Sequence, residues 1–505
     1  MSTNDLLAIR NGQAVDRSVC PVVSVDRFRQ AVIESVADGA RLSALLAEPA
    51  GDAGAARLMA VLARPSLGNL AVVACEVGDS YPALTPDCPS AHLFEREIAE
   101  QWNIRPDGHP WLKPVRFQPP CKAAKKGVAA GQTTAGVMNF FKMDGQEVHE
   151  VAVGPVHAGV IEPGHFRFQC HGETVHHLEI SLGYQHRGVE RALVGGPTGR
   201  TIHYIETLAG DTTVGHATAY CLAAESISDM HPPARAEAIR AAAAELERIA
   251  NHVGDLGALA GDVGFLPTMS YCGRIRGDVL NLTALLCGNR FGRGLLLPGG
   301  TAYDADDELI AELLRRLDDV ERDATRAIDL LFDNPSVLAR FEGTGAISEE
   351  LARQIGLVGV PARACSLPCD IRQEFPYGLY QFTQMPVCTW RTGDCFARAY
   401  VRWLEIQQSL AFVREQMRSL PTGPTRLDAK PLRPNKLAVA MVEGWRGEIC
   451  HVAATDAQGR FAFYKVVDPS FHNWFGLAYA LREQQVSDFP LCNKSFNLSY
   501  CGHDL

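Results

Sequence analysis

The stretch PPARAEAIRAAAAELERIANHVGDLGALAGD, residues 232–262, decides the fold class of this sequence. It begins with Pro232 and Pro233, which a helix tolerates in its first turn, and then runs through strong helix formers for well over twenty residues. We therefore predict a long core helix. Residues 304–334 and 393–417 predict two more, because their acidic residues lie near the start and their basic residues nearer the end, as the helix dipole favours. The middle of the chain is thus predicted to be a helical bundle.

Strand-like sequence flanks this bundle on both sides. After it, residues 437–471 form alternating runs around DAQG at 456–459, which is a hairpin signal. Before it, residues 24–39 predict a capped amphipathic helix, and residues 58–65 and 68–78 predict two strands. The sequence therefore predicts helices and sheets in separate blocks of the chain.

A later helix near the start of the chain carries three charged residues in a row. They are Glu95, Arg96 and Glu97, and we predict that all three lie on its surface. After it comes PPCKAAKKGVAAGQTTAG, which is rich in Gly, Ala and Lys without periodicity and reads as a linker. We predict an α+β fold with a small α/β domain at residues 1–118, a linker at 119–148, and a large, mainly helical domain with peripheral β-sheets at 149–505.

Composition excludes several classes of protein. The 505 residues are 47% hydrophobic and 21% charged, which is enough to build a sizeable core. A net charge of -10 without a long basic block argues against nucleic acid as a partner. There is no apolar run of the roughly 20 residues that cross a bilayer, and the first residues lack the build of a secretion signal, so we expect a chain kept in the cytoplasm. Fifteen scattered cysteines, an odd number, do not predict a disulfide framework.

Polar and turn residues gather in two neighbouring stretches. These are GPVHAGVIEPGHFRF at 154–168 and LGYQHRGVE at 182–190, where histidines, arginines and glutamates are embedded among glycines. Such a combination is typical of the wall of a polar cavity. A loop and a hairpin with solvated histidines would produce the same composition, and both interpretations stay open on the residues alone.

These stretches, together with residues 245–265, 288–300 and 393–409, resemble a known family. They look like the shared core of the quinone-site large subunit of respiratory complex I and of the large subunit of membrane-bound, energy-converting nickel-iron hydrogenases. The first domain is similar to the smaller complex I subunit that is fused ahead of the large one in some of these complexes. The resemblance implies a small α/β domain joined to a mostly helical domain with peripheral sheets.

The resemblance also implies where a nickel-iron site would have its ligands. Hydrogenases supply four thiolates as two C-x-x-C pairs, because this metal pair needs soft ligands. The matching positions here are Ala209 and Thr212 in the first pair and Asn497 and Tyr500 in the second. Since none of these is a thiol, we predict no metal on this chain, although Cys501 lies one position off the expected register.

The complex I branch implies a different set of site residues. Its quinone-binding tyrosine matches Gly210 here and is therefore missing. We predict that His157, His165 and Asp262 are catalytic, with His165 and Asp262 acting as a coupled proton store. A structural bond that orients the loop is the alternative for this pair. The remaining residues that match the cavity pattern are Glu162, Arg167, Tyr184, His186, Arg187, Glu190 and His216.

These matches imply the large subunit of a membrane-associated, complex I-like oxidoreductase, a peripheral subunit on the cytoplasmic side of the membrane. We expect electrons to pass from a small iron-sulfur subunit to a quinone-like acceptor, coupled to proton or ion translocation by antiporter-like membrane subunits. The 4Fe-4S cluster and any NAD or flavin would belong to partners, because the chain has no dinucleotide or Walker A motif. Three alternatives are NADH-driven quinone reduction, a non-catalytic scaffold and a genuine hydrogenase, of which the last is disfavoured by the missing thiolates.

Overall fold

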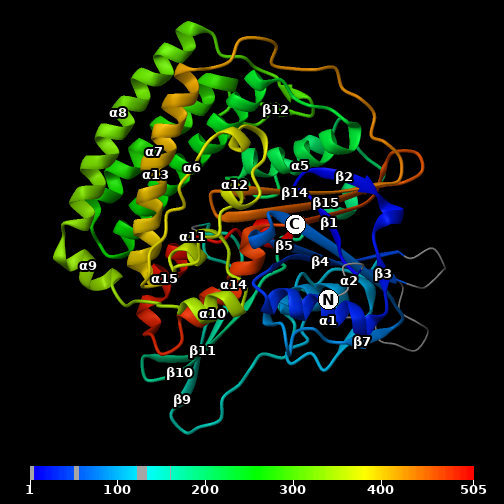
Figure 1. The fold of residues 1–505 in the computed structure, drawn as a ribbon. Coiled ribbons are helices and arrows are strands. Elements are labelled where there is room, and N and C mark those ends of the chain that lie inside the picture. The colour runs from blue at the N-terminus through cyan, green and yellow to red at the C-terminus, as the bar shows by residue number, and fades with distance from the viewer. Residues whose placement is uncertain (1–4, 50–55, 122–133, 160) are drawn as a thin grey trace.

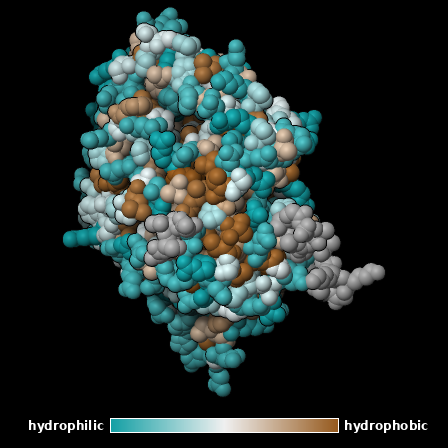
Figure 2. Space-filling view, turned by 45° about the vertical axis from the view of Figure 1, so that its right-hand side comes forward, coloured by the Kyte–Doolittle hydropathy of each residue, from teal (hydrophilic) through white to brown (hydrophobic). Residues whose placement is uncertain are grey.

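The computed structural model describes residues 5–49, 56–121, 134–159 and 161–505 (Figure 1). It confirms the α+β prediction. A β-rich N-terminal region lies beside a large helical part, and the C-terminal sheet lies between them in the view of Figure 1. Figure 2 shows that apolar side chains gather near the middle of one face, with hydrophilic side chains around them.

The N-terminal region is built on one sheet. Its described strands run in the order β1-β6-β5-β4, with β3 pairing in parallel with β6. The predicted helix is α1 (Val25–Ala37), which begins after Ser24, whose side chain accepts a hydrogen bond from the Arg27 backbone N–H. The other elements here are β1 (Leu7–Ile9), β3 (Val22–Val23), β4 (Arg41–Pro49), β5 (Ala56–Arg64), β6 (Asn69–Val77), β7 (Ser80–Pro82), α2 (His92–Trp102) and β8 (Arg105–Asp107).

We predicted that Glu95, Arg96 and Glu97 lie on the surface of α2, and this prediction is wrong for the two glutamates. Glu95 and Glu97 are buried. Glu95 accepts hydrogen bonds from the backbone N–H groups of Leu84 (2.7 Å) and Thr85 (2.9 Å). Glu97 pairs with Arg116 and with Lys465 (2.6 Å). Buried carboxylates need partners of this kind, and Lys465 comes from a part of the chain that local sequence does not reveal.

Long helices form the centre of the large part. The stretch at 232–262 folds into α6 (Ala234–Asp262), which packs against α7 (Leu266–Cys287) and α13 (Cys395–Arg418). The alanine run of α6 keeps its surface flat, so that neighbouring helices can approach closely. The other helices are α3 (Val189–Leu193), α4 (Thr201–Ile205), α5 (Thr213–Ser228), α8 (Asp307–Phe332), α9 (Pro335–Phe341), α10 (Glu349–Gln354), α11 (Gly359–Arg363), α12 (Ile371–Glu374), α14 (Pro469–Ala480), α15 (Phe489–Phe496) and α16 (Tyr500–Asp504).

Two larger sheets and the two-stranded sheet β12-β13 complete the large part. One is the antiparallel sheet β11-β10-β9. The other has the order β16-β15-β14-β2, so that β2 (Gln13–Asp16), from the start of the chain, pairs with β14. The strands are β9 (Val148–Val153), β10 (His165–His171), β11 (Thr174–Ser181), β12 (Leu296–Leu297), β13 (Gly300–Thr301), β14 (Lys436–Gly444), β15 (Gly447–Thr455) and β16 (Phe461–Val467). Among the described residues, no helix is both long and apolar enough to cross a bilayer.

Candidate functional site

Three segments that are far apart in the sequence meet at one place. They are the loop at 182–188 after β11, the segment at 206–212 before α5, and the C-terminal residues 497–505. The Arg187 side chain donates hydrogen bonds to the backbone oxygens of Thr207 (2.5 Å), Leu208 (3.0 Å) and Cys501 (3.2 Å). Its backbone N–H donates to Leu505 O at 2.9 Å. One arginine therefore holds all three segments together.

Arg446 lies at the turn between β14 and β15 and joins the same segments from the other side. Its guanidinium contacts both carboxylate oxygens of Asp211, at 2.6 and 2.8 Å, and donates to Thr212 Oγ1 at 3.1 Å. It also donates to Asn497 O at 2.6 Å. Although burial opposes the charged form of Asp211, the Arg446 guanidinium holds the pKa of this carboxyl below its ordinary value.

Sequence reasoning missed Arg446 and Asp211. The partners of Arg446 lie 51 and 235 residues away, so no spacing rule connects them. One signal was available in the sequence. A Trp-Arg-Gly turn, residues 445–447, follows one apolar strand and precedes another, and a buried hairpin with a charged residue at its tip suggests a functional position.

The positions predicted to match the hydrogenase cysteines fall in the segments that this arginine joins. Thr212 and Asn497 both contact Arg446, and the Asn497 side chain also donates to Asp255 Oδ1 at 2.6 Å. Ala209 is fully buried. The Tyr500 ring packs edge-on against Trp474 with 4.9 Å between ring centroids. The structure thus brings the two predicted stretches, 209–212 and 497–500, into one site.

A chain of buried polar side chains leads away from the site. His216 Nε2 lies 3.0 Å from Asp468 Oδ2, and His216 Nδ1 lies 3.1 Å from His451 Nε2. His451 Nδ1 in turn lies 2.9 Å from the Tyr464 hydroxyl. Burial lowers the pKa of His451 well below its ordinary value, so this imidazole is neutral and can accept from His216. His216 Nε2 can donate to Asp468, and the hydrogen between His216 Nδ1 and His451 Nε2 can lie on either ring.

The pKa of Asp468 is lowered. Burial opposes its charged form, but the hydrogen bond and charge of His216 outweigh that penalty. The carboxylate also caps α14 by accepting from Ser470 N at 2.8 Å. A buried carboxylate and imidazole in contact can store one proton between them.

Glu247 is a further buried carboxyl that the sequence did not single out. Its two oxygens accept from Val214 N (2.7 Å) and Gly215 N (3.1 Å), at the start of α5. Burial raises its pKa to about 8 in spite of these two hydrogen bonds, with Asp211 as a further charge that disfavours ionisation. This carboxyl therefore changes protonation state near neutral pH, beside backbone groups that directly precede His216.

The structure does not bring His165 and Asp262 together. His165 Nδ1 donates to Gly154 O at 3.3 Å, and its Nε2 accepts from Arg167 Nε at 3.3 Å. Asp262 ends α6 and is exposed; partial desolvation by neighbouring atoms raises its pKa, while the charge of Lys494 lowers it. No hydrogen bond or ion pair between the two side chains occurs in the described part of the chain. Their role as a coupled pair stays a prediction.

The remaining predicted residues divide between loop contacts and the site. His157 Nε2 donates to Gly164 O at 2.8 Å, within its own loop. Glu162 accepts from Gln185 at 3.0 Å and lies near Cys501, whose pKa is raised to about 11 by burial and then by this carboxylate.

The other side chains of the two loops make contacts of similar length. His186 Nδ1 donates to Asp504 O at 2.6 Å. Glu190 accepts from Val466 N at 2.9 Å, and Arg167 pairs with Glu150 at 3.2 Å. Tyr184 is half-buried, and burial raises its pKa. Most of these groups hold loops in place, and His186, Arg187 and Glu162 are the ones that adjoin the C-terminal segment.

The described residues, 5–49, 56–121, 134–159 and 161–505, contain no evident metal centre. No group of three or more of their His, Cys, Asp or Glu side chains is arranged to hold a metal ion.

Comparison with known proteins places the chain in a family. The family model for the 49 Kd subunit of respiratory-chain NADH dehydrogenase matches residues 262–437. The carbon monoxide-induced hydrogenase of Rhodospirillum rubrum is 31% identical over 350 residues, covering 69% of this chain and 97% of the relative. Formate hydrogenlyase subunit 5 of Escherichia coli (strain K12) is 28% identical, covering 83% of this chain and 76% of the relative.

A fused relative matches as well. The C/D polypeptide of the NADH-quinone oxidoreductase of Bacteroides thetaiotaomicron is 27% identical over 402 residues, which cover 72% of this chain and 75% of the relative. The match to the Rhodospirillum rubrum protein spans nearly all of that relative at 31% identity. The chain therefore belongs to the family of the complex I 49 kDa subunit and the nickel-iron hydrogenase large subunit, in a fused, C/D-like form.

Proposed function

We propose that this chain is the large subunit of a membrane-associated, complex I-like oxidoreductase that passes electrons from an iron-sulfur partner to an organic acceptor. The observation that carries the proposal is the set of donors at the site. Where hydrogenases have four thiolates, the resemblance places Ala209, Thr212, Asn497 and Tyr500. A methyl group, a hydroxyl, an amide and a phenol do not fit a nickel-iron centre, which needs soft thiolates.

The surroundings of these positions support the same conclusion. The Thr212 hydroxyl and the Asn497 backbone oxygen are both bound to Arg446, and the Asn497 amide is bound to Asp255. Arg446 therefore cross-links the two stretches without a metal.

We propose that the acceptor is a quinone-like molecule. Reduction of a quinone to a hydroquinone takes two electrons and two protons, and the iron-sulfur partner would supply the electrons one at a time. The chain would supply protons through His216 and Asp468, which lie in contact and beside the segment that Arg446 holds. The alternative proton store, His165 and Asp262, lacks a direct contact between its two side chains.

Exposed apolar side chains at the start of α7 support docking of a partner subunit. Leu266, Met269 and Tyr271 are 61%, 46% and 56% exposed. Exposed apolar side chains grouped in this way commonly mark contact surfaces between proteins. We propose that such surfaces receive the iron-sulfur subunit and antiporter-like membrane subunits, and that ion transport occurs in those membrane subunits.

The test is the composition of the complex purified from membranes through a tag on this chain. We expect iron without nickel, together with a quinone recovered by organic extraction. Nickel at about one per large subunit, an amount matching one active site, would contradict the proposal and return the chain to the hydrogenases.

A non-catalytic scaffold is the second candidate, and the density of contacts at Arg446 favours it. Asp211, Thr212 and Asn497 together occupy most of the donors of that guanidinium. The two candidates differ in bound quinone, in quinone reductase activity and in the effect of Arg446→Lys. A scaffold complex would contain iron but neither bound quinone nor quinone reductase activity, and Arg446→Lys would then leave electron transfer through the complex unchanged.

A further inference from the structure

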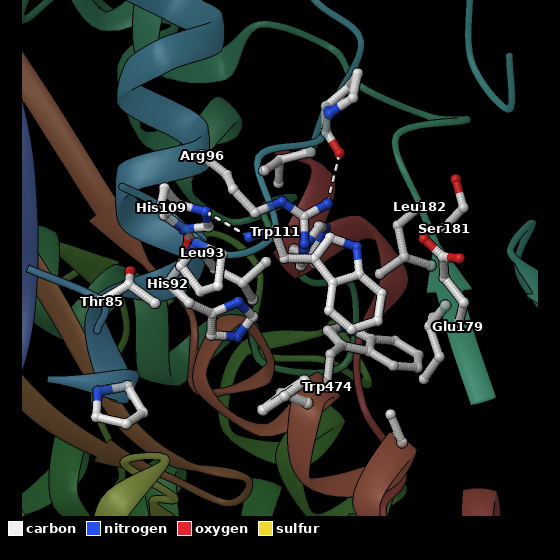
Figure 3. Close-up of a pocket in the computed structure, with 18 of the residues that line it drawn as sticks. Thr85, His92, Leu93, Arg96, His109, Trp111, Glu179, Ser181, Leu182 and Trp474 are labelled. Carbon is white, nitrogen blue, oxygen red and sulfur yellow. Dashed lines mark hydrogen bonds between the residues drawn. The ribbon is translucent and has the colours of Figure 1, made fainter. Parts of the chain in front are cut away.

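A cavity of about 500 Å³ lies at the seam between the N-terminal region and the large part of the chain (Figure 3). On one side it is lined by α2 and by residues 108–115. On the other side it is lined by the end of β11, by α14 and by His503 of α16. None of the site residues predicted from the sequence lines it. A volume of this size suits a small organic molecule.

The walls of this seam pocket are mainly apolar and aromatic. Trp111, Trp474 and Phe475 are the large rings that line it, with Leu93 and Leu182 beside them. Trp111 stacks on His177 at 5.3 Å with an interplanar angle of 20°, so its orientation is fixed by packing. Flat rings held in place in this way suit a flat apolar ligand, because such a ligand can stack without reorganising the walls.

Arg96 brings a positive charge to this apolar pocket. Its Nε donates to Lys113 O at 2.9 Å and its Nη2 to Pro114 O at 2.8 Å, while it forms no ion pair with any carboxylate of the described chain. Burial lowers its pKa to about 10, so the side chain is still charged at neutral pH. Glu179 and Glu100 act on this half-buried cation and raise its pKa, but neither carboxylate lies within ion-pair distance of the guanidinium.

Both carboxylates are engaged elsewhere, and Glu100 accepts from Arg116 N at 3.0 Å. Glu179, which also lines the pocket, accepts from Lys113 Nζ at 2.6 Å and from Phe141 N at 2.7 Å. It is therefore neutralised by a different cation. The charge of Arg96 is left available to a ligand.

The three histidines that line the pocket, His92, His109 and His503, do not add charge. His109 accepts from Trp111 N at 3.0 Å and donates to His92 O at 3.2 Å, so both of its ring nitrogens are occupied. Burial lowers the pKa of His109 to about 4 and that of His92 well below its ordinary value. Burial also lowers the pKa of His503, although its hydrogen bond with Asp504 opposes this, so all three rings are uncharged at neutral pH. The pocket then carries the positive charge of Arg96 beside the Lys113–Glu179 pair.

We propose that the seam pocket binds an amphipathic organic monoanion, with a flat apolar body among Trp111, Trp474 and Phe475 and a carboxylate on Arg96. The guanidinium supplies two donors in a fork that matches a carboxylate. The ligand would bridge the N-terminal region and the large part, since its ring contacts and its charge contact come from both. The proposal concerns binding only and does not depend on the quinone-like acceptor proposed above.

The pocket shares a wall with the candidate site, where residues 182–188, 206–212 and 497–505 meet. Leu182 lines the pocket, and the next residue, Gly183, donates its N–H to Asp504 at 2.8 Å. Trp474 lines the pocket and contacts Tyr500. A ligand in the pocket would therefore rest against the segments that hold the C-terminal residues in place.

The test is isothermal titration calorimetry on the purified complex that contains the full chain. The probes are 2-naphthoate, its neutral amide 2-naphthamide, and 1,4-naphthoquinone, which share a flat two-ring body and differ in charge. We expect 2-naphthoate to bind best, and Arg96→Gln to weaken its binding about tenfold or more, the usual size of one lost charge-assisted hydrogen bond. Binding of the amide should hardly change in that variant.

Two further variants keep the test decisive if Arg96→Gln folds poorly. Ala478→Leu fills part of the pocket on the α14 side and should weaken all three probes without touching the cation. Arg322→Gln removes an exposed arginine on α8 and should leave every affinity unchanged. Naphthoquinone binding as tight as naphthoate and insensitive to Arg96→Gln would overturn the anionic assignment, and absence of binding by all three probes would overturn the pocket as a ligand site.

Discussion

Arg446 and Asp211 form a two-pronged ion pair, with N–O distances of 2.6 and 2.8 Å, that ties the β14–β15 turn to the segment before α5. The pair has an asymmetric environment, since Arg446 is almost fully buried while Asp211 is half-buried. Removal of the carboxylate would therefore leave a buried cation with only neutral acceptors.

Asp211→Asn should accordingly destabilise the chain and reduce quinone reductase activity together. We expect a loss of about 2 kcal/mol in the free energy of unfolding, because a buried guanidinium loses its counter-ion. Chemical denaturation of the purified complex measures this loss. Asp323→Asn, at a pair with the exposed Arg274, is the matched control and should cost well under about 1 kcal/mol. Equal costs at the two sites would contradict the role given to Asp211.

His216→Gln and Asp468→Asn should each lower turnover by about tenfold or more while leaving quinone content unchanged, because a proton donor then lacks its partner. Steady-state kinetics and quinone extraction measure the two quantities on the same preparation. Asp468→Asn should also alter acid stability. The folded pKa of Asp468 is lowered, so its contribution is present above the ordinary carboxyl pKa and is lost as pH falls through the lower folded value. A variant with unchanged turnover would remove these two residues from the proton path.

Glu247 should make stability depend on pH in the opposite direction. Its folded pKa is about 8, raised from 4.5, so the stability it contributes is present in full below pH 4.5 and is lost as pH rises through 8. Glu247→Gln cannot ionise and should therefore be more stable relative to the unchanged chain at pH 9 than at pH 6. Thermal melts at the two pH values measure the difference. If the variant shifts the melting temperature by the same amount at both, Glu247 does not titrate in this range.

His165→Ala and Asp262→Asn should act independently of each other. Since no contact joins the two side chains, the double variant should lose the sum of the two single losses, with a coupling energy below about 0.5 kcal/mol. The measured quantity is the activity of the four proteins in the cycle, converted to free energies. A coupling energy of about 1 kcal/mol or more, as expected for contacting residues, would show that the two residues work as a pair and restore the prediction made from the sequence.

The sequence predicted the parts of the structure that depend on local pattern. The helix α6 and the hairpin at 456–459 were both evident, because alanine-rich runs and turn residues have strong local preferences. The burial of Glu97 was not, since its partner Lys465 lies 368 residues further along. Arg446 was missed for the same reason. Local sequence indicates on which face of a helix or strand a charged residue lies. Whether that residue is buried depends on which other helix or strand packs against that face.

The same limit applies to the site. The resemblance predicted the two stretches at 209–212 and 497–500, and the structure brings them together. What it could not predict was the pairing within the site: Asp468, which binds His216, lies 252 residues away, and the contact expected between His165 and Asp262 does not form in the described chain. Pairings of this kind are set by tertiary packing.

The pairing of β2 with β14 has a consequence for how the chain is made. Lys436 and Asp16, which face each other in this pair, are separated by 420 residues. A ribosome therefore releases one edge of the sheet long before the strand that covers it has been synthesised. Until then the early strand has unpaired backbone groups that could associate with other chains. This sheet can be completed only after residues 436–439 have been synthesised, and it ties together two segments that leave the ribosome 420 residues apart.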